Sequence, residues 1–136
     1  MTHTNTRPGC IFCEKPMDER LFTLKHAFAC LDLHPVAPGH ILVIPARHEA
    51  SWFGLNRREQ EAMLEILDRA REYLDVRYSP DGYTIGVNEG AAAGQTVFHV
   101  HLHLIPRYAN DVDDPRGGIR GVLPGKQHYP IHTPDD

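Results

Sequence analysis

The chain has 136 residues, of which 41% are hydrophobic and 24% charged, and a formal net charge of −4 at pH 7. This length predicts one domain with a single core, spanning residues 1–136. The negative charge argues against broad binding to nucleic acid or to an anionic membrane, since both need clustered Lys and Arg. No apolar run is long enough to span a membrane, and the first ten residues do not resemble a secretory signal. A cytoplasmic location is therefore expected.

The first part of the chain predicts three strands. Two short apolar runs, 21–24 and 28–31, flank a turn and indicate a hairpin. Residues 39–45 form a third strand that ends at a proline, which cannot continue a hydrogen-bonded ladder. We expect these three strands to be neighbours in one sheet.

A long helix is predicted over residues 57–76. Asn56 is a good N-cap, and Glu59 follows three positions later, which is the arrangement of a capping box. Apolar residues then recur at the spacing of one helix face. A turn signal at 79–82 ends this helix.

Two more strands are predicted after the helix, at 83–88 and 97–106, joined by the loop 89–95. Five strands and one long helix indicate an α+β domain in which the helix packs on one face of the sheet. The residues from 110 onward are rich in Gly, Pro and charge, and we expect an irregular tail.

The most informative motif is His99-Val100-His101-Leu102-His103-Leu104. Side chains alternate between the two faces of a strand, so the three histidines are expected on one face. The opposite face would then hold the apolar side chains of Phe98, Val100, Leu102 and Leu104. Polar groups are costly to bury unpaired, so three aligned imidazoles indicate a reactive face. The small-residue loop 88–96 just upstream would let backbone amides approach a phosphate.

The run Gly94-Gln95-Thr96-Val97-Phe98-His99-Val100-His101-Leu102-His103 resembles the signature of the histidine triad (HIT) family. Matches at Leu31-Asp32-Leu33, Pro38-Gly39-His40 and Leu42-Val43-Ile44-Pro45 extend the resemblance over about residues 10–108, leaving 109–136 as a tail. It implies a five-stranded antiparallel sheet with one long helix and a short one. It also implies a homodimer that binds a purine nucleotide. His103 argues against the related uridylyltransferase branch, which has glutamine at that place.

The resemblance also implies roles for single residues. His101 matches the nucleophile, which attacks the α-phosphorus and forms a nucleotidyl-histidine that water later resolves. Gln95, Thr96 and His103 match positions that contact the phosphate or the leaving group, and Asp32 matches a carboxylate that binds the ribose hydroxyls. The remaining nucleotide positions are matched by Ile11, Phe12, Leu31, Leu33, Asn88, Gly94 and Val97. The apolar members of this set would fit the core equally well.

Cys10 and Cys13 form a second motif, Cys-Ile-Phe-Cys. Their spacing suits tetrahedral zinc if two more ligands come from elsewhere, and two reduced buried thiols are the other interpretation. The resemblance is to bacterial family members in which such a pair joins two histidines, matched here by His48 and His99. It implies a structural Zn²⁺. Cys30 is expected to be a core residue.

The leading hypothesis is an enzyme that cleaves at the α-phosphate of a purine nucleotide. Thr96 and the pair Pro106-Arg107 depart from the phosphoramidate branch of the family, so a dinucleoside polyphosphate, a nucleoside phosphoramidate and an adenylate all remain candidate substrates. One alternative is a nucleotide-binding regulatory module with little turnover. Another is a catalytic metal ion held by His99, His101 and His103. Arg116 and Arg120 either reach a polyphosphate or belong to a solvated tail.

Overall fold

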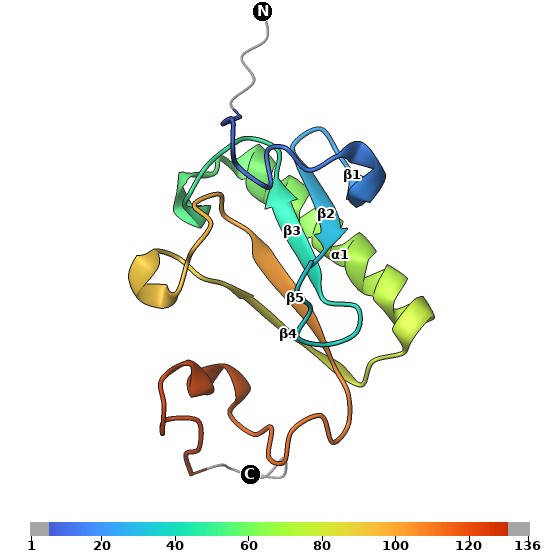
Figure 1. The fold of residues 1–136 in the computed structure, drawn as a ribbon. Coiled ribbons are helices and arrows are strands. Elements are labelled where there is room, and N and C mark those ends of the chain that lie inside the picture. Colours follow the sequence, from blue (N-terminus) through green and yellow to red (C-terminus); the bar gives the residue numbers. More distant parts are fainter. Residues whose placement is uncertain (1–5, 131–136) are drawn as a thin grey trace, which may run out of the picture.

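The structure is a computed structural model that describes residues 6–130. Five antiparallel strands form one sheet in the order β1-β2-β3-β5-β4, and one long α-helix covers one of its faces (Figure 1). The strands are β1 (Arg20–Thr23), β2 (Ala27–Leu31), β3 (Ile41–Pro45), β4 (Gly82–Val87) and β5 (Leu102–Arg107), and the helix is α1 (Arg57–Tyr78). Within residues 6–130, no helix has the length and apolar character needed to cross a membrane. The predicted fold class is confirmed.

The start of α1 is fixed by the capping box that the sequence predicts. The Asn56 side chain accepts a hydrogen bond from the Glu59 amide, and the Glu59 carboxylate accepts one from the Asn56 amide, both at 2.9 Å. Arg47 donates two more hydrogen bonds to this carboxylate, at 2.8 and 3.0 Å. Glu59 is buried, so these bonds tie the first turn of α1 to the segment that follows β3.

Replacing Glu59 with glutamine is expected to lower the free energy of unfolding by about 1.5–3 kcal/mol, because a buried charge-assisted pair with Arg47 is lost. Hydrogen bonding from Arg47 holds the pKa of Glu59 below its ordinary value in the folded protein. Such a group stabilises the fold at neutral pH and loses this effect as pH falls through its folded-state pKa. The difference in the free energy of unfolding between variant and wild type, measured with urea, should therefore become smaller in acid. Glu61→Gln, at an exposed position of the same helix, is the control.

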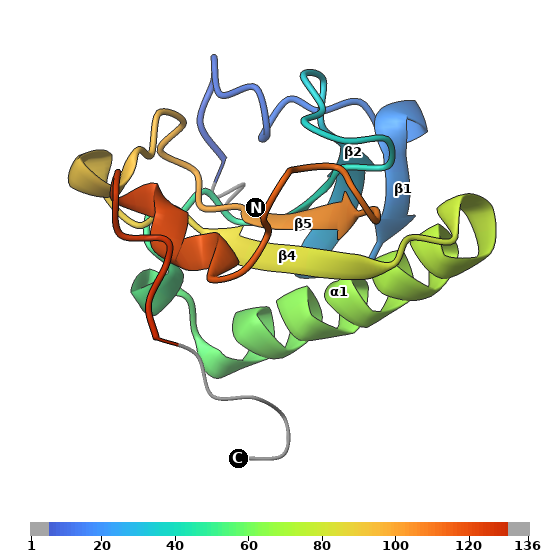
Figure 2. The ribbon, with the colours of Figure 1, turned by 90° about the horizontal axis from the view of Figure 1, so that it is seen from below.

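Strand alternation divides the sheet into two faces (Figure 2). The face under α1 is a closed apolar core, which includes Ala27, Ala29, Ile41, Val43, Leu102 and Leu104 from the strands and Met63, Ile66, Ala70 and Leu74 from the helix. On the opposite face, Cys30 of β2 pairs in register with Leu42 of β3, which pairs with His103 of β5. The N-terminal segment lies over this second face, where Phe12 packs on the strands. The face away from the helix is therefore the one that presents a histidine.

One predicted strand is shorter than expected, because β5 begins at Leu102 and not at residue 97. Pro45, at the end of β3, has no amide hydrogen, and its carbonyl oxygen accepts a hydrogen bond from Nε2 of His99 at 2.7 Å. The ladder with β3 therefore ends at Leu102. The prediction of one continuous strand through the three histidines was wrong, because His99 and His101 precede β5, although His101 and His103 still line the same cavity. Phe98 is 50% exposed instead of packed.

The other boundaries agree with the sequence to within about two residues. The helix ends at Tyr78, and Ser79 follows in the left-handed region with φ 47°. The short second helix that the family resemblance implied is found, within residues 6–130, only as 3₁₀ turns, of which the longest is Gly118–Val122 in the irregular tail.

Candidate functional site

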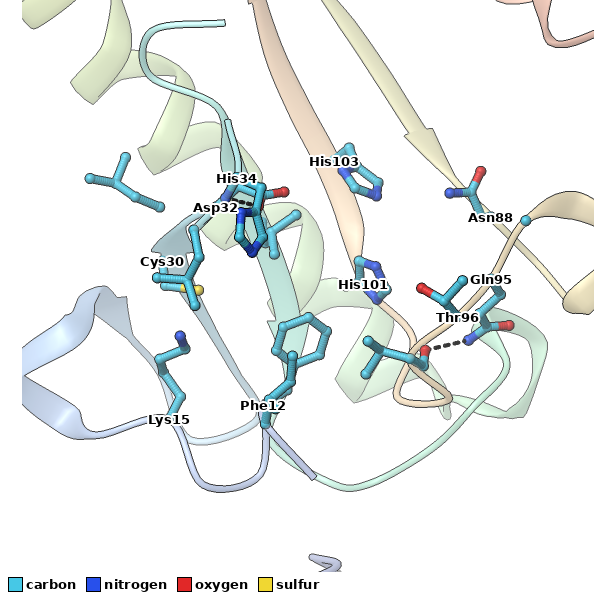
Figure 3. Close-up of a pocket in the computed structure, with 16 residues that line it drawn as sticks. Phe12, Lys15, Cys30, Asp32, His34, Asn88, Gln95, Thr96, His101 and His103 are labelled. Carbon is cyan, nitrogen blue, oxygen red and sulfur yellow. Dashed lines mark hydrogen bonds between the residues drawn. The ribbon is translucent and has the colours of Figure 1, made fainter. Parts of the chain in front are cut away.

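A cavity of about 300 Å³ lies on the sheet face away from α1. Sixteen described residues line it, from the N-terminal segment, β2 and the residues just after it, β3, the loop before β5, and β5 (Figure 3). They include every residue that the sequence suggested for catalysis or nucleotide binding: Ile11, Phe12, Leu31, Asp32, Leu33, Asn88, Gly94, Gln95, Thr96, Val97, His101 and His103. The fold thus brings together residues that are up to 92 positions apart, from Ile11 to His103.

Four lining residues were not predicted: Lys15, Cys30, His34 and Leu42. Cys30 and Leu42 could have been found from strand alternation, because they share a face and a register with His103. Cys30 is also buried, as expected for a core residue. Lys15 follows the cysteine pair by two positions, and no motif in the sequence pointed to it.

His101 lies immediately before β5, with its ring close to the rings of Phe12 and His103, at centroid distances of 4.9 and 5.1 Å. Its Nδ1 is 2.9 Å from the carbonyl oxygen of His99. A carbonyl can only accept, so Nδ1 carries the hydrogen, and in the neutral ring Nε2 carries the lone pair. His101 therefore lines the cavity as an imidazole with a defined tautomer.

His103 has the opposite tautomer, and its hydrogen-bond chain begins at a backbone amide. The Val36 amide donates to Nδ1 of His40 at 3.2 Å, so in the neutral ring Nε2 of His40 carries the hydrogen. This Nε2 lies 3.0 Å from Nδ1 of His103, which accepts. Burial, with the neighbouring His101 and His40, lowers the pKa of His103 to about 4, so the ring is neutral near pH 7. Nε2 of His103 is thus left as a hydrogen-bond donor.

His40 was noted in the sequence only as part of a family match, yet it is 2% exposed and is the residue that orients His103. Burial lowers the pKa of His40, opposed by the nearby Asp32 carboxylate, whose Oδ2 lies 3.5 Å from Nε2 of His40. The other carboxylate oxygen of Asp32 accepts a hydrogen bond from the His34 amide at 2.8 Å. These contacts hold the Asp32 carboxylate at the cavity wall with lone pairs left for a ligand hydroxyl.

Gln95 holds the loop before β5 in place. Its side-chain oxygen accepts from the Gly90 amide at 2.8 Å, and its side-chain nitrogen donates to the carbonyl oxygens of Ala50 and Val97 at 2.8 and 3.2 Å. The side chain is buried and both polar atoms are engaged. Gln95 therefore orders the loop that presents Thr96. The family resemblance had implied that Gln95 itself contacts the phosphate or the leaving group.

Cys10, Cys13, His48 and His99 form a second cluster, and their potential ligand atoms all lie within 4.8 Å of one another. Nδ1 of His99 lies 3.4 Å from both sulfur atoms, and Nδ1 of His48 lies 3.2 Å from Sγ of Cys13. Two thiolates and two imidazoles are a usual donor set for tetrahedral zinc, with metal–ligand distances of about 2.0–2.3 Å. The residues present therefore fit a metal ion of this type.

The tautomer of His99 also suits a metal ligand. Its Nε2 must donate to the carbonyl oxygen of Pro45, which leaves the lone pair on Nδ1 facing the two sulfur atoms. Burial lowers the pKa of His99 to about 4. Among residues 6–130, the candidate metal groups do not combine His99 with His101 or His103, so the geometry gives no support to one ion held by those three histidines. The other such group consists of Asp32, His40 and His103.

The two tail arginines do not line the cavity. Arg116 forms an ion pair with Asp114 at 3.0 Å, and Arg120 donates to the Lys126 carbonyl at 3.2 Å and stacks on the ring of Tyr129. Both side chains are thus engaged within the tail, as expected if these arginines do not reach a polyphosphate.

The α+β domain, the cavity lined by His101 and His103, and the Cys₂His₂ cluster beside it agree with the expectations from the sequence patterns and the family resemblance. Comparison with known families supports the resemblance, because the model of the HIT domain matches residues 15–110. The chain belongs to the HIT domain family.

Individual proteins agree with this membership. An uncharacterized HIT-like protein of Mycoplasma genitalium is 38% identical over 108 residues, which cover 76% of this chain and 77% of that protein. The bis(5'-adenosyl)-triphosphatase of Dictyostelium discoideum is 36% identical over 96 residues, covering 71% and 64%. The crystal structure of a zinc-bound histidine triad family protein from Mycobacterium smegmatis superposes with a TM-score of 0.68 at 32% identity, covering 76% and 78%.

Proposed function

We propose that this protein cleaves a purine nucleotide at its α-phosphate through a covalent intermediate on His101. The broader statement, that it is a histidine triad nucleotide hydrolase, follows from its family and from relatives that are named bis(5'-adenosyl)-triphosphatases. The observation that supports the covalent step is the pair of opposite tautomers in the cavity. Nε2 of His101 offers a lone pair, and Nε2 of His103 offers a hydrogen.

In the first step, Nε2 of His101 attacks the α-phosphorus and forms a P–N bond while the bond to the leaving group breaks. Nε2–H of His103 can donate a hydrogen bond to the departing oxygen or nitrogen, which takes any proton it needs from solvent, and His40 holds the ring in the required orientation. In the second step, water attacks the nucleotidyl-histidine, the P–N bond breaks and His101 leaves. His101 leaves as the neutral imidazole, the proton of the attacking water passes to solvent, and His103 keeps its Nε2–H as a hydrogen-bond donor throughout.

Substrate binding is assigned to the remaining lining residues. In this proposal the Asp32 carboxylate accepts hydrogen bonds from the ribose hydroxyls, and Thr96 and Gly94, in the loop that Gln95 orders, contact the phosphate; support comes from their common position at the cavity wall. The base would lie between Phe12, which is buried, and the exposed side chains of Ile11, Leu31 and Leu33. Apolar side chains at a cavity wall offer a base a surface on which to stack. Asn88 and Val97 complete the nucleotide site.

We also propose that the Cys₂His₂ cluster binds one structural Zn²⁺. This rests on the donor set, the separations of the ligand atoms and the His99 tautomer. The ion would tie the N-terminal segment to the segment before β5, and so fix Phe12 beside His101. Its proposed contribution is structural.

A homodimer is proposed as the functional form. The apolar face of α1 is already buried against the sheet, and Trp52 is partly buried against the same core, so neither is free to form the interface. The edge of the sheet at β4 offers a better surface, because in the described chain β4 pairs only with β5, and its Ile85 is 45% exposed. Light scattering at micromolar concentration should give twice the chain mass of 15.4 kDa, and a monomeric mass would contradict the proposal.

The proposed activity is tested by a hydrolysis panel that compares a dinucleoside tetraphosphate, an adenosine phosphoramidate and an aminoacyl adenylate. Each has a different leaving group on the same α-phosphorus. The proposal requires release of a nucleoside monophosphate from at least one of them. No turnover of any of the three, by protein that still binds nucleoside monophosphate, would favour a regulatory nucleotide-binding module instead.

A further inference from the structure

Lys15 is a buried cation in the cavity for which the proposed reaction has no use. Its side chain is 7% exposed. Within residues 6–130 its ammonium forms one ion pair, with Glu19 at 3.7 Å, and the Glu19 side chain is itself 53% exposed. Among the described residues that line the cavity, Lys15 is also the only lysine or arginine. The ammonium is not fully enclosed, since every fully buried side-chain nitrogen or oxygen of the described residues has a hydrogen-bond partner, and a ligand that supplies a close acceptor would give this ammonium a hydrogen bond inside the cavity.

The backbone of Lys15 is fixed from two sides. Arg20 donates two hydrogen bonds to the Lys15 carbonyl oxygen, at 3.2 and 3.0 Å, and its guanidinium stacks 3.9 Å above the ring of Phe28. The Lys15 amide donates to the Phe12 carbonyl oxygen at 3.3 Å. The side chain is therefore presented to the cavity from an ordered backbone.

The position of Lys15 indicates which part of a nucleotide it meets. Lys15 lies on the side of Cys30 and across the cavity from His101 (Figure 3). The Lys15 charge is also close enough to Cys30 to oppose the rise that burial causes in the pKa of this thiol. If the α-phosphate lies at His101 and the ribose at Asp32, as the proposed function has it, the base points toward Lys15.

Lysine is a selective partner for a base because its ammonium has three donors and no acceptor. Guanine presents two adjacent acceptors, N7 and O6, which lysine can bind together, whereas adenine presents one acceptor, N7, beside the N6 amine donor. We propose that Lys15 is a specificity residue that makes this cavity prefer 6-oxopurine nucleotides, guanine above all, over adenine nucleotides. This preference differs from the adenosyl substrates in the names of several relatives.

The experiment is calorimetric binding of GMP, IMP and AMP to the full chain, which requires no turnover and so tests Lys15 separately from the proposed reaction. Wild type should bind GMP roughly tenfold or more tightly than AMP, since one good two-point contact to a base gives about this discrimination. IMP has the same O6 and N7 but lacks the 2-amino group, so it should bind like GMP. Lys15→Met should reduce the ratio of the GMP affinity to the AMP affinity to within about twofold of unity.

Lys25→Met, the same substitution at an exposed turn position, is the matched control and should keep the wild-type ratio. Lys15→Gln is the second variant, and thermal melting of each protein confirms that it is folded. The proposal is overturned if wild type binds AMP as tightly as GMP, if IMP behaves like AMP, or if the folded Lys15 variants keep the wild-type ratio. If none of the substrates in the hydrolysis panel is cleaved but these ratios hold, the proposed reaction fails and the base preference stands.

Discussion

His101→Ala is expected to lower kcat and kcat/KM together, by at least about a hundredfold on the best substrate, while nucleotide affinity changes little. The reason is that His101 makes its essential bond only along the reaction path, so its loss removes transition-state stabilisation and not ground-state binding. Steady-state kinetics measure both constants, and calorimetry with a nucleoside monophosphate measures the affinity. Wild type should also yield an acid-labile nucleotide adduct on His101 by mass spectrometry during turnover.

Two further variants are compared with His101→Ala. His128→Ala removes an exposed histidine that pairs with Asp114 in the tail, and it should leave the kinetics unchanged. Asp32→Ala should mainly raise KM, by roughly one to two orders of magnitude, because a charge-assisted hydrogen bond to ribose is made equally in the ground and transition states. A folded His101→Ala protein with more than a few per cent of the wild-type kcat would refute the covalent mechanism.

Local patterns were sufficient to predict most of the fold. The capping box at Asn56 and Glu59 placed the start of α1 correctly, since the signal lies within four consecutive residues. The strand boundaries were close for a similar reason, because apolar alternation and turn residues are local. The start of β5 was missed because it depends on Pro45, 57 positions before Leu102 in the sequence. A proline at the end of one strand removed the donor that its partner strand needed.

For the candidate site, too, the sequence predicted features that follow from a motif and missed those that depend on the fold. The residues that line the cavity were named from a motif, but the sequence could not give the tautomers of the histidines. Those depend on backbone groups of Val36, Pro45 and the segment before β5, which the fold brings beside the rings. Lys15 was missed because its backbone is held by Arg20, which stacks on Phe28, and neither of these residues shares a motif with it. The sequence also could not show that the Gln95 side chain is bonded to Gly90, Ala50 and Val97, whereas its contact with the phosphate or leaving group stays a prediction.

Removal of a metal ligand is the second change from which we expect a large effect. Cys10→Ala should reduce bound zinc from one per chain to well below one, as measured by elemental analysis of the purified protein. An ion present at about a thousand times its Kd stabilises a fold by roughly 4 kcal/mol. For a domain of this size that corresponds to a fall in Tm of roughly 10–15 °C. Cys30→Ala, outside the cluster, should keep its zinc.

Cys10→Ala should also raise KM, because Ile11 and Phe12 lie between the two cysteines and form part of the cavity wall. Without the ion, the N-terminal segment loses its tie to His99, and Phe12 is no longer fixed beside His101. Zinc would then act on substrate binding through the placement of a wall, with no contact to the substrate itself. A Cys10→Ala protein that retained full zinc content and the wild-type Tm would show that the four residues are not the ligands.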